Sequence, residues 1–229
     1  MKKLVLIISF FILSCCCKAQ WQTINSPNTG SNAYSVVEFI NDNIGFIGCD
    51  SSLLYKTNDG GNTWLSYNST DLPISSNNTD LRTTHISFTS DSIGYLFICS
   101  ASEDEGWLYK TTNQGNDWAL IKNMVSYGYD YYDMEFVDSN HGVMFFKRNL
   151  FKTIDGGVSW DSTYIAPSVR SILITAFDTS NVRMEFEYYN SGWKDSIIYS
   201  STFCDSLYGL SDVGLNSSVS ITDSISYAI

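Results

Sequence analysis

Apolar residues in this chain form short runs separated by polar turns, and no long stretch with helical spacing follows residue 20. One phrase, a Phe, a polar turn and a Gly six residues after the Phe, occurs at 39–46, 88–95 and 136–143. Each copy predicts a strand, a turn and a second strand. The three phenylalanines are about 50 residues apart, which is the length of a four-stranded propeller blade.

A second phrase follows each copy of the first. It reads K-T-N-D-G-G-N-T-W at 56–64, K-T-T-N-Q-G-N-D-W at 110–118 and K-T-I-D-G-G-V-S-W at 152–160. A Gly-containing core between two β-rich runs predicts a tight hairpin, because Gly adopts the positive φ that such turns need. Asp59, Asn113 and Asp155 are predicted to accept hydrogen bonds from N–H groups of their own turns. The closing tryptophans are predicted to cover the seam between two packed sheets.

Each unit is therefore interpreted as four strands: the first ends near the Phe, the second begins near the Gly, the third ends in Lys-Thr and the fourth starts at the Trp. A fourth, degraded unit has strands at 172–177, 182–188 and 196–202 but no turn phrase. Residues 21–24 resemble a fourth strand and are predicted to complete the last blade. Residues 221–229 resemble the start of a fifth unit. The sequence predicts an all-β propeller of about four blades, part of a longer one. The alternative is a small propeller closed by unusual ends.

The first twenty residues have the features of a targeting segment. Lys2 and Lys3 precede an apolar run at 4–13, and small or thiol residues follow. Two kinds of processing stay open: cleavage near Ala19, or lipid attachment at Cys15, because I-L-S-C at 12–15 looks like a bacterial lipobox. Both predict an exported propeller domain at 21–229 that is secreted, periplasmic or associated with an outer membrane.

Composition narrows the classes of function. The formal net charge of −11 argues against a nucleic-acid partner and against electrostatic docking to anionic lipid. Outside the leader, Cys49, Cys99 and Cys204 are too few for a disulfide framework, and Cys49 and Cys99 are expected to be buried free thiols. His85 and His141 look isolated, so neither a metal site nor a catalytic triad is predicted. No cofactor is predicted either.

The turn phrase resembles the Asp-box, or BNR, repeat, whose pattern is [ST]-x-D-x-G-x-[ST]-W. Two copies match it fully, at Thr57, Asp59, Gly61, Thr63 and Trp64, and at Thr153, Asp155, Gly157, Ser159 and Trp160. The middle copy keeps Gly115 and Trp118 but has Asn113 and Asp117 at two of the motif positions. The whole unit looks most like propellers of the photosystem II assembly and stability factor type, and more distantly like the sortilin ectodomain. This resemblance implies that the motif is a structural turn and not a catalytic site.

Candidate ligand-binding residues lie on loops predicted for the opposite face. They are aromatic residues with nearby carboxylates, which suit a protein or glycan ligand because rings stack on sugar faces or apolar side chains while carboxylates accept hydrogen bonds from hydroxyl or amide groups. The candidates are Tyr127, Tyr129, Tyr131, Tyr132, Trp107 and Trp193. The simpler interpretation is that the tyrosines pack between blades.

The most favoured function is a non-enzymatic scaffold for binding or assembly, with a protein or glycan ligand of unknown identity. The alternative is a fragment of an Asp-box glycoside hydrolase. A sialidase-like site needs an arginine cluster, and the chain has only Arg82, Arg148, Arg170 and Arg183. A carboxylate pair such as Glu103 and Glu185 is conceivable for another glycosidase, but no pattern in the sequence positions the two.

Overall fold

The computed structural model describes residues 25–27, 33–50, 54–67, 72, 81–100, 105–125, 132–146, 149–164, 169–189, 193–200, 203 and 225–228. These residues form strands and turns without a helix, so the all-β prediction is confirmed. It follows that no helix of the described residues is long and apolar enough to cross a membrane. The leader with Cys15, residues 21–24 and Cys204 lie outside the described residues.

The strands make four antiparallel sheets of four strands each, called blades one to four here. Blade one contains β1 (Tyr34–Phe39), β2 (Gly45–Cys49), β3 (Leu54–Thr57) and β4 (Leu65–Tyr67). Blade two contains β5 (Leu81–Phe88), β6 (Gly94–Ser100), β7 (Glu105–Thr111) and β8 (Ala119–Val125). Blade three contains β9 (Tyr132–Phe136), β10 (Gly142–Phe146), β11 (Asn149–Thr153) and β12 (Asp161–Tyr164). Blade four contains β13 (Val169–Asp178), β14 (Asn181–Tyr189), β15 (Trp193–Ser200) and β16 (Ile225–Ala228).

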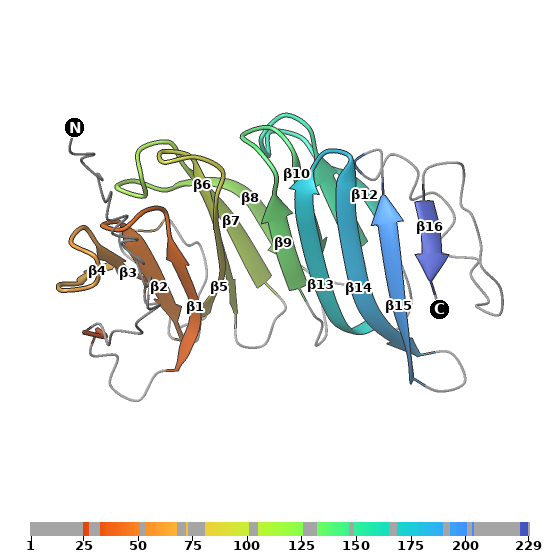
Figure 1. Cartoon of the computed structure of the whole chain (residues 1–229), viewed down its shortest axis with the longest axis horizontal. Helices are drawn as coiled ribbons and strands as arrows, with labels where there is room; N and C mark the ends of the chain where they lie inside the picture. The colour runs from red at the N-terminus through yellow and green to blue at the C-terminus, as the bar shows by residue number, and fades with distance from the viewer. Residues whose placement is uncertain are drawn as a thin grey trace, which may run out of the picture.

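The blades follow one another side by side in chain order (Figure 1), and the first strand of each contacts the first strand of the next. This arrangement, in which each sheet runs outward from a shared inner edge, is that of a β-propeller. The strands β1, β5, β9 and β13 form this edge and are called the inner wall.

The repeated Phe and Gly hold the first two strands of each regular blade together. Phe39 pairs with Gly45, Phe88 with Gly94 and Phe136 with Gly142. The ring lies across the Gly so closely that a Cβ atom added to Gly45 would sit 2.6 Å from the ring of Phe39. Only Gly fits there, which explains the constant spacing of the phrase.

Apolar side chains fill the spaces between neighbouring blades. The second strands β2, β6 and β10 are buried along their whole length, as expected for strands covered on both faces. Trp118 of blade two packs edge-on against Phe46 of blade one and Phe88 of blade two, with ring centroids 6.2 and 6.0 Å apart. Cys49 and Cys99 are buried and form no disulfide, as predicted.

Blade four confirms three of its predicted strands and corrects one prediction. Its first three strands, β13 to β15, lie where the degraded fourth unit was expected. The prediction that residues 221–229 begin a fifth blade is wrong for the described part of that segment. Ile225–Ala228 instead pairs with β15 as the fourth strand of blade four. An apolar strand sequence does not specify which edge it pairs with, because that choice depends on which edge is open.

Candidate functional site

The turn phrase of blade one hydrogen-bonds to itself. The Asp59 carboxylate accepts bonds from the Thr63 N–H at 2.8 Å and from the Thr63 hydroxyl at 2.6 Å. The Thr57 hydroxyl donates to the same carboxylate at 2.8 Å and accepts from the Gly61 N–H at 2.8 Å. These bonds favour the charged carboxylate and lower the pKa of Asp59, with the Thr63 hydroxyl as the largest cause.

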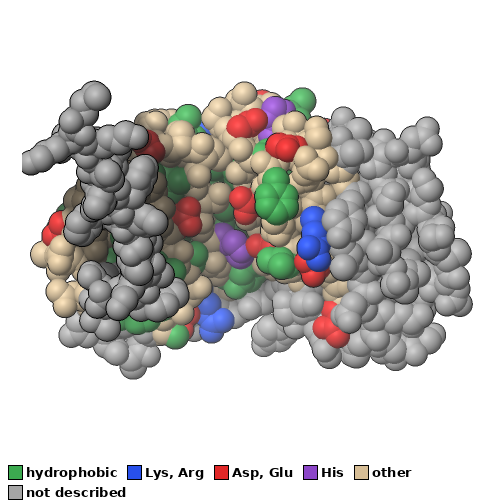
Figure 2. All heavy atoms as spheres, in the orientation of Figure 1, with side chains coloured by type: hydrophobic (Ala, Val, Ile, Leu, Met, Phe, Trp, Pro, Cys, Tyr) green, Lys and Arg blue, Asp and Glu red, His purple; other side chains and the backbone are tan. Residues whose placement is uncertain are grey.

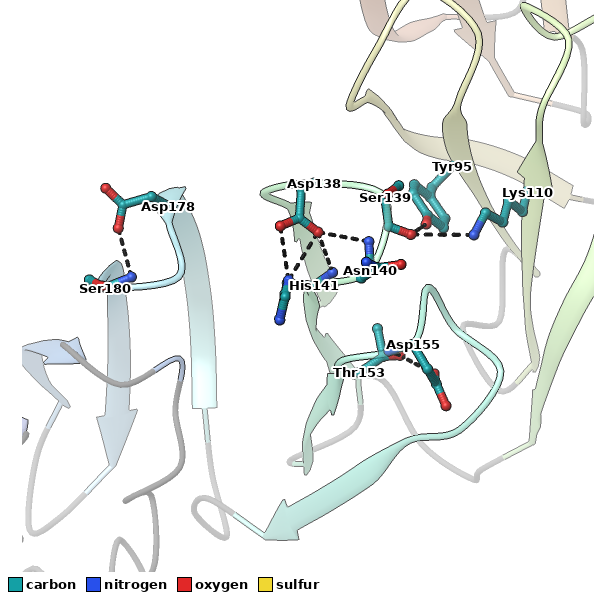
Figure 3. Close-up of polar contacts among 10 residues, drawn as sticks. All are labelled: Tyr95, Lys110, Asp138, Ser139, Asn140, His141, Thr153, Asp155, Asp178 and Ser180. Carbon is teal, nitrogen blue, oxygen red and sulfur yellow. Dashed lines mark hydrogen bonds and ion pairs between the residues drawn. The ribbon is translucent and has the colours of Figure 1, made fainter.

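The other two turns have the same geometry. In blade three the Ser159 hydroxyl and N–H both donate to Asp155, which lowers the pKa of Asp155 to about 2. The Thr153 hydroxyl donates to the same carboxylate at 2.8 Å (Figure 3). In blade two the Asn113 side-chain oxygen accepts from the Asp117 N–H at 3.0 Å, and its NH₂ group donates to the Asp117 carboxylate at 2.8 Å. Asn in place of the acid and Asp in place of the hydroxyl residue thus preserve the turn. The side-chain bond between the two positions is kept with its direction reversed, because the first residue now donates and the second accepts.

The Lys of the phrase has a role that sequence reasoning missed. Lys56 is only 2% exposed, and its Nζ atom donates to the Gln114 carbonyl and the Asn116 side chain of the next blade, both at 2.7 Å. Lys110 reaches the Gly156 carbonyl of blade three in the same way at 3.1 Å. The sequence signal for this role was the Lys that directly precedes the buried Thr in all three copies of the phrase. The turns therefore join neighbouring blades, and their polar groups are engaged within the protein.

The predicted aromatic ligand residues lie in different places. Trp107 is fully buried, 0% exposed, in the core shared by blades one and two, so the prediction that it is an exposed binding residue is wrong. It belongs to β7 and not to a loop, and it pairs with buried Ile98 on a strand that is covered on both faces. Tyr127, Tyr129 and Tyr131 lie outside the described residues. For Trp193 only the backbone, at the start of β15, is described.

Tyr132 is the one predicted aromatic residue that the described structure places on the inner wall. It is half-buried at the start of β9, with its ring edge-on to His85 at 6.0 Å and to Phe97 at 5.9 Å. Its neighbour His85 belongs to a set of titratable side chains on the wall that the sequence did not predict as a site.

His85 reaches blade three because of a β-bulge. Thr83 pairs with Ile98 and His85 pairs with Phe97, so Thr84 is an extra residue in β5. Cross-strand partners share a face, and Phe97 belongs to the core between blades two and three. The bulge therefore turns the imidazole toward blade three, where its Nε2 atom lies 2.5 Å from Oδ1 of Asp133.

Asp133 connects three consecutive blades. Besides His85 of blade two, its carboxylate accepts a hydrogen bond from the Ile174 N–H of blade four at 2.5 Å and from the adjacent Met134 N–H at 2.9 Å. The residue itself is 8% exposed. Because these contacts tie β9 to β5 on one side and to β13 on the other, Asp133 fixes the spacing of the inner strands.

Two further carboxylates on the wall, Glu38 and Glu135, have no such donors among the residues that the structure describes. Burial is the largest cause that raises the pKa of Glu135, to about 7, and the nearby charges of Asp133 and Glu38 raise it further, while His85 lowers it. Burial also raises the pKa of Glu38. No hydrogen bond from a described residue contributes to either shift. Figure 2 shows Asp, Glu and His side chains gathered over the central described part of this face.

The repeat contains a signal for these residues in hindsight. Glu38 and Glu135 each come directly before the repeated Phe, whereas His85 and Asp133 each stand three residues before it. The prediction that the two histidines are isolated is wrong. His85 pairs with Asp133, and His141 lies 2.9 Å from Asp138 in the turn of blade three (Figure 3). Within the described residues no cluster of His, Cys, Asp or Glu has the arrangement of a metal site.

The carboxylate pair considered for a glycosidase does not form a site in the described structure. Glu185 lies on β14, where its carboxylate is 2.7 Å from the Arg183 guanidinium. Glu103 lies outside the described residues. The wall carries two other glutamates, Glu38 on β1 and Glu135 on β9.

Comparison with known proteins supports the fold. No protein-family model and no curated protein matches the sequence. A structure of YCF48 bound to D1 peptide is 15% identical with a TM-score of 0.51, over 75% of this chain and 62% of that one. YCF48 from Cyanidioschyzon merolae is 15% identical with a TM-score of 0.53, over 85% and 72%. A GH74 enzyme from Niastella koreensis is 14% identical with a TM-score of 0.45, over 74% and 34%. The two YCF48 structures show a shared β-propeller fold.

Proposed function

We propose that this protein is a non-enzymatic propeller that binds a segment of another protein on its inner wall. The observation that carries the proposal is the group formed by Glu38, His85, Asp133 and Glu135, which come from three blades. Two of its carboxylates have no described donor, whereas the carboxylates of the turns are fully engaged. Binding sites in propellers commonly use groups that converge from several blades, because one blade alone offers little concave surface.

Two further points support a protein ligand. The YCF48 structure with a D1 peptide is an example of a propeller of this fold holding a peptide. The leader-like first twenty residues and Cys15 favour an exported scaffold, either secreted or held at a membrane by a lipid. We therefore propose that the partner is an exported or envelope-associated protein. A glycan ligand, the other ligand class that the loop aromatics favour, is an outcome of the test.

The test selects ligands without assuming one. A random peptide library displayed on phage is panned on the wild-type protein and then screened against the variant Glu38→Gln, Asp133→Asn, Glu135→Gln. The control variant Asp42→Asn, Asp91→Asn, Asp161→Asn removes the same charge at three exposed positions. We expect selected peptides to bind the wild type and the control but not the wall variant. Peptides that bind all three equally, or binding only to a glycan array, would overturn the proposal.

One observation favours a second candidate, a glycoside hydrolase. Three carboxylates, Glu38, Asp133 and Glu135, share the wall, and burial together with the other two raises the pKa of Glu135 to about 7. A raised pKa beside a second carboxylate is the pattern of a general acid in glycosidases. Incubation with a panel of polysaccharides, followed by reducing-sugar detection, tests this candidate. Hydrolysis by the wild type that is lost in Glu135→Gln would favour the enzyme over the scaffold.

A further inference from the structure

We propose that two copies of this chain join end to end, with blade four of one copy packed on blade one of the other. The surface involved on blade one is its outer face, which is turned away from blade two and carries Val37 and Phe39. On blade four it is the face turned away from blade three, which carries Leu173 and Arg183. This contact is independent of the ligand proposed above.

The position two residues before the repeated Phe contacts the preceding blade. Ile86 in blade two and Met134 in blade three occupy it, and they are 7% and 2% exposed in the cores between their blades and the preceding ones. In blade four Ala176 takes the place of the Phe, and Ile174, two residues before it, is 4% exposed. In blade one the position belongs to Val37, which is 61% exposed. Blade one thus leaves exposed an apolar side chain that the other three blades bury.

The position three residues before the Phe contacts the following blade. Val36 packs against the core between blades one and two, and His85 of blade two reaches Asp133 of blade three. Asp133 in turn accepts a hydrogen bond from a backbone N–H of blade four. In blade four this position belongs to Leu173, which pairs with Glu185 on the face turned away from blade three and is 53% exposed.

The two exposed positions are complementary. Val36 and Ile86 pack in the same core, between blades one and two. Leu173 has the place of Val36 in its blade, and Val37 has the place of Ile86. Blade four of one copy followed by blade one of another therefore repeats a contact that this chain already makes, with first strand against first strand as in the described blades. A second copy is the partner that fits both faces.

A polar contact is also repeated. In blades two and three, the carbonyls of Gln114 and Gly156 accept a hydrogen bond from the repeated Lys of the preceding blade. In blade one the equivalent Gly60 carbonyl has no such donor among the described residues. On blade four Arg183 has the place of Phe46, the residue that pairs with the Lys of blade one, and its side chain is 39% exposed. A guanidinium has several donors, so we expect Arg183 to donate to the Gly60 carbonyl of the other copy.

The contact joins unlike faces, so it leaves one face of each kind open until the assembly closes. Two copies related by a twofold axis make the contact twice and leave no face open. With four described blades from each copy, the ring has eight blades, and known propellers have about four to eight. The inner walls of both copies then line one channel.

The experiment is sedimentation velocity of the purified protein over a concentration series, and we expect a dimer. Val37→Lys and Leu173→Glu each place a charge in the apolar contact, so each variant alone is expected to be monomeric. The control Val158→Glu changes an apolar residue in the turn of blade three that is 86% exposed, and it should remain dimeric. Circular dichroism and thermal denaturation check that the variants are folded.

A mixture of the two charged variants tests whether unlike faces meet. In a mixed dimer one contact has two unchanged faces, and the other brings the two introduced, opposite charges together. The mixture is therefore expected to restore the dimer that neither variant forms alone. A monomeric wild type, a dimer that survives both substitutions, or a mixture that stays monomeric would overturn the proposal.

Discussion

Blades two and four contain the same order of four antiparallel strands, but their second strands are buried differently. In blade two all of β6 is buried. In blade four β14 alternates: Val182, Met184 and Phe186 are buried, whereas the Arg183 and Glu185 between them form an ion pair. Blade two lies between two other blades, while the second face of β14 carries charged side chains. A continuous apolar strand thus indicates a strand covered on both faces, and an alternating strand indicates one that the described residues cover mainly on one face.

The same two blades differ in the contacts that the repeat specifies. Blade four lacks the Phe-Gly pair, because Ala176 pairs with Val182 and the nearby Phe177 is 77% exposed. It also lacks the Lys-Thr turn phrase, since Tyr199 and Ser200 end its third strand. The Phe, the Gly, the Lys and the turn therefore occur together in blades one to three, and they are lost together in blade four.

The largest predicted effect concerns the repeated Phe. Phe136 is 3% exposed and lies across Gly142, whereas Phe177 is exposed. Phe136→Ala should reduce the free energy of unfolding by about 3–5 kcal/mol, because it leaves a cavity in the core. Phe177→Ala should change it by less than about 0.5 kcal/mol. Urea denaturation followed by tryptophan fluorescence measures both, and similar losses would mean that blade four shares the core of the regular blades.

The second prediction concerns the link between blades. Lys56→Met should cost about 1–3 kcal/mol in the free energy of unfolding, because the Gln114 carbonyl and the Asn116 side chain lose a buried donor. The matched variant Lys122→Met removes a half-buried lysine whose Nζ atom lies over the rings of Phe151 and Trp160. Its expected cost is about 0.5–1 kcal/mol. An equal cost for the two variants, again in urea denaturation, would argue against a special role for the repeated Lys.

The third prediction concerns Glu135 and pH. Its pKa in the folded protein is raised from 4.5 to about 7, so folding opposes its ionisation. The wild type should therefore lose stability as pH rises from 4.5 to 7, relative to Glu135→Gln. At pH 8 the variant should be more stable by about 1 kcal/mol, after allowance for solvent screening of a partly exposed group. Thermal denaturation at pH 4.5 and pH 8 tests this sign, and a difference that does not change with pH would contradict it.

The smallest effect is expected in an exposed turn. Asp155→Asn should be tolerated, because Asn113 already holds the same turn in blade two with its side-chain oxygen. The pKa of Asp155 is lowered to about 2, so the wild type should lose the contribution of this carboxylate as pH falls from 3.8 to 2, and the Asn variant should not. Melting temperatures measured across that range compare the two proteins, with Asp161→Asn as the control. A large loss at neutral pH would show that the amide cannot replace the acid here.

The strands, the turns and the blade length were determined by the sequence alone. They depend on local properties, such as the Gly that a crossing Phe requires and the hydroxyl and carboxylate that bond within one turn, and these properties recur at a fixed spacing. The first three strands of blade four were predictable because each has its own strand-like sequence. No turn phrase follows the third strand, so the sequence did not show which segment forms the fourth.

The tertiary structure decided the candidate site. His85 and Asp133 are 48 residues apart, and they meet only because a bulge at Thr84 reverses the face of the strand and because two blades pack side by side. Packing likewise buries Trp107, which looked exposed when its loop was judged by composition. Whether a polar or aromatic side chain is covered depends on the neighbouring blade, and that information is spread over distant parts of the chain.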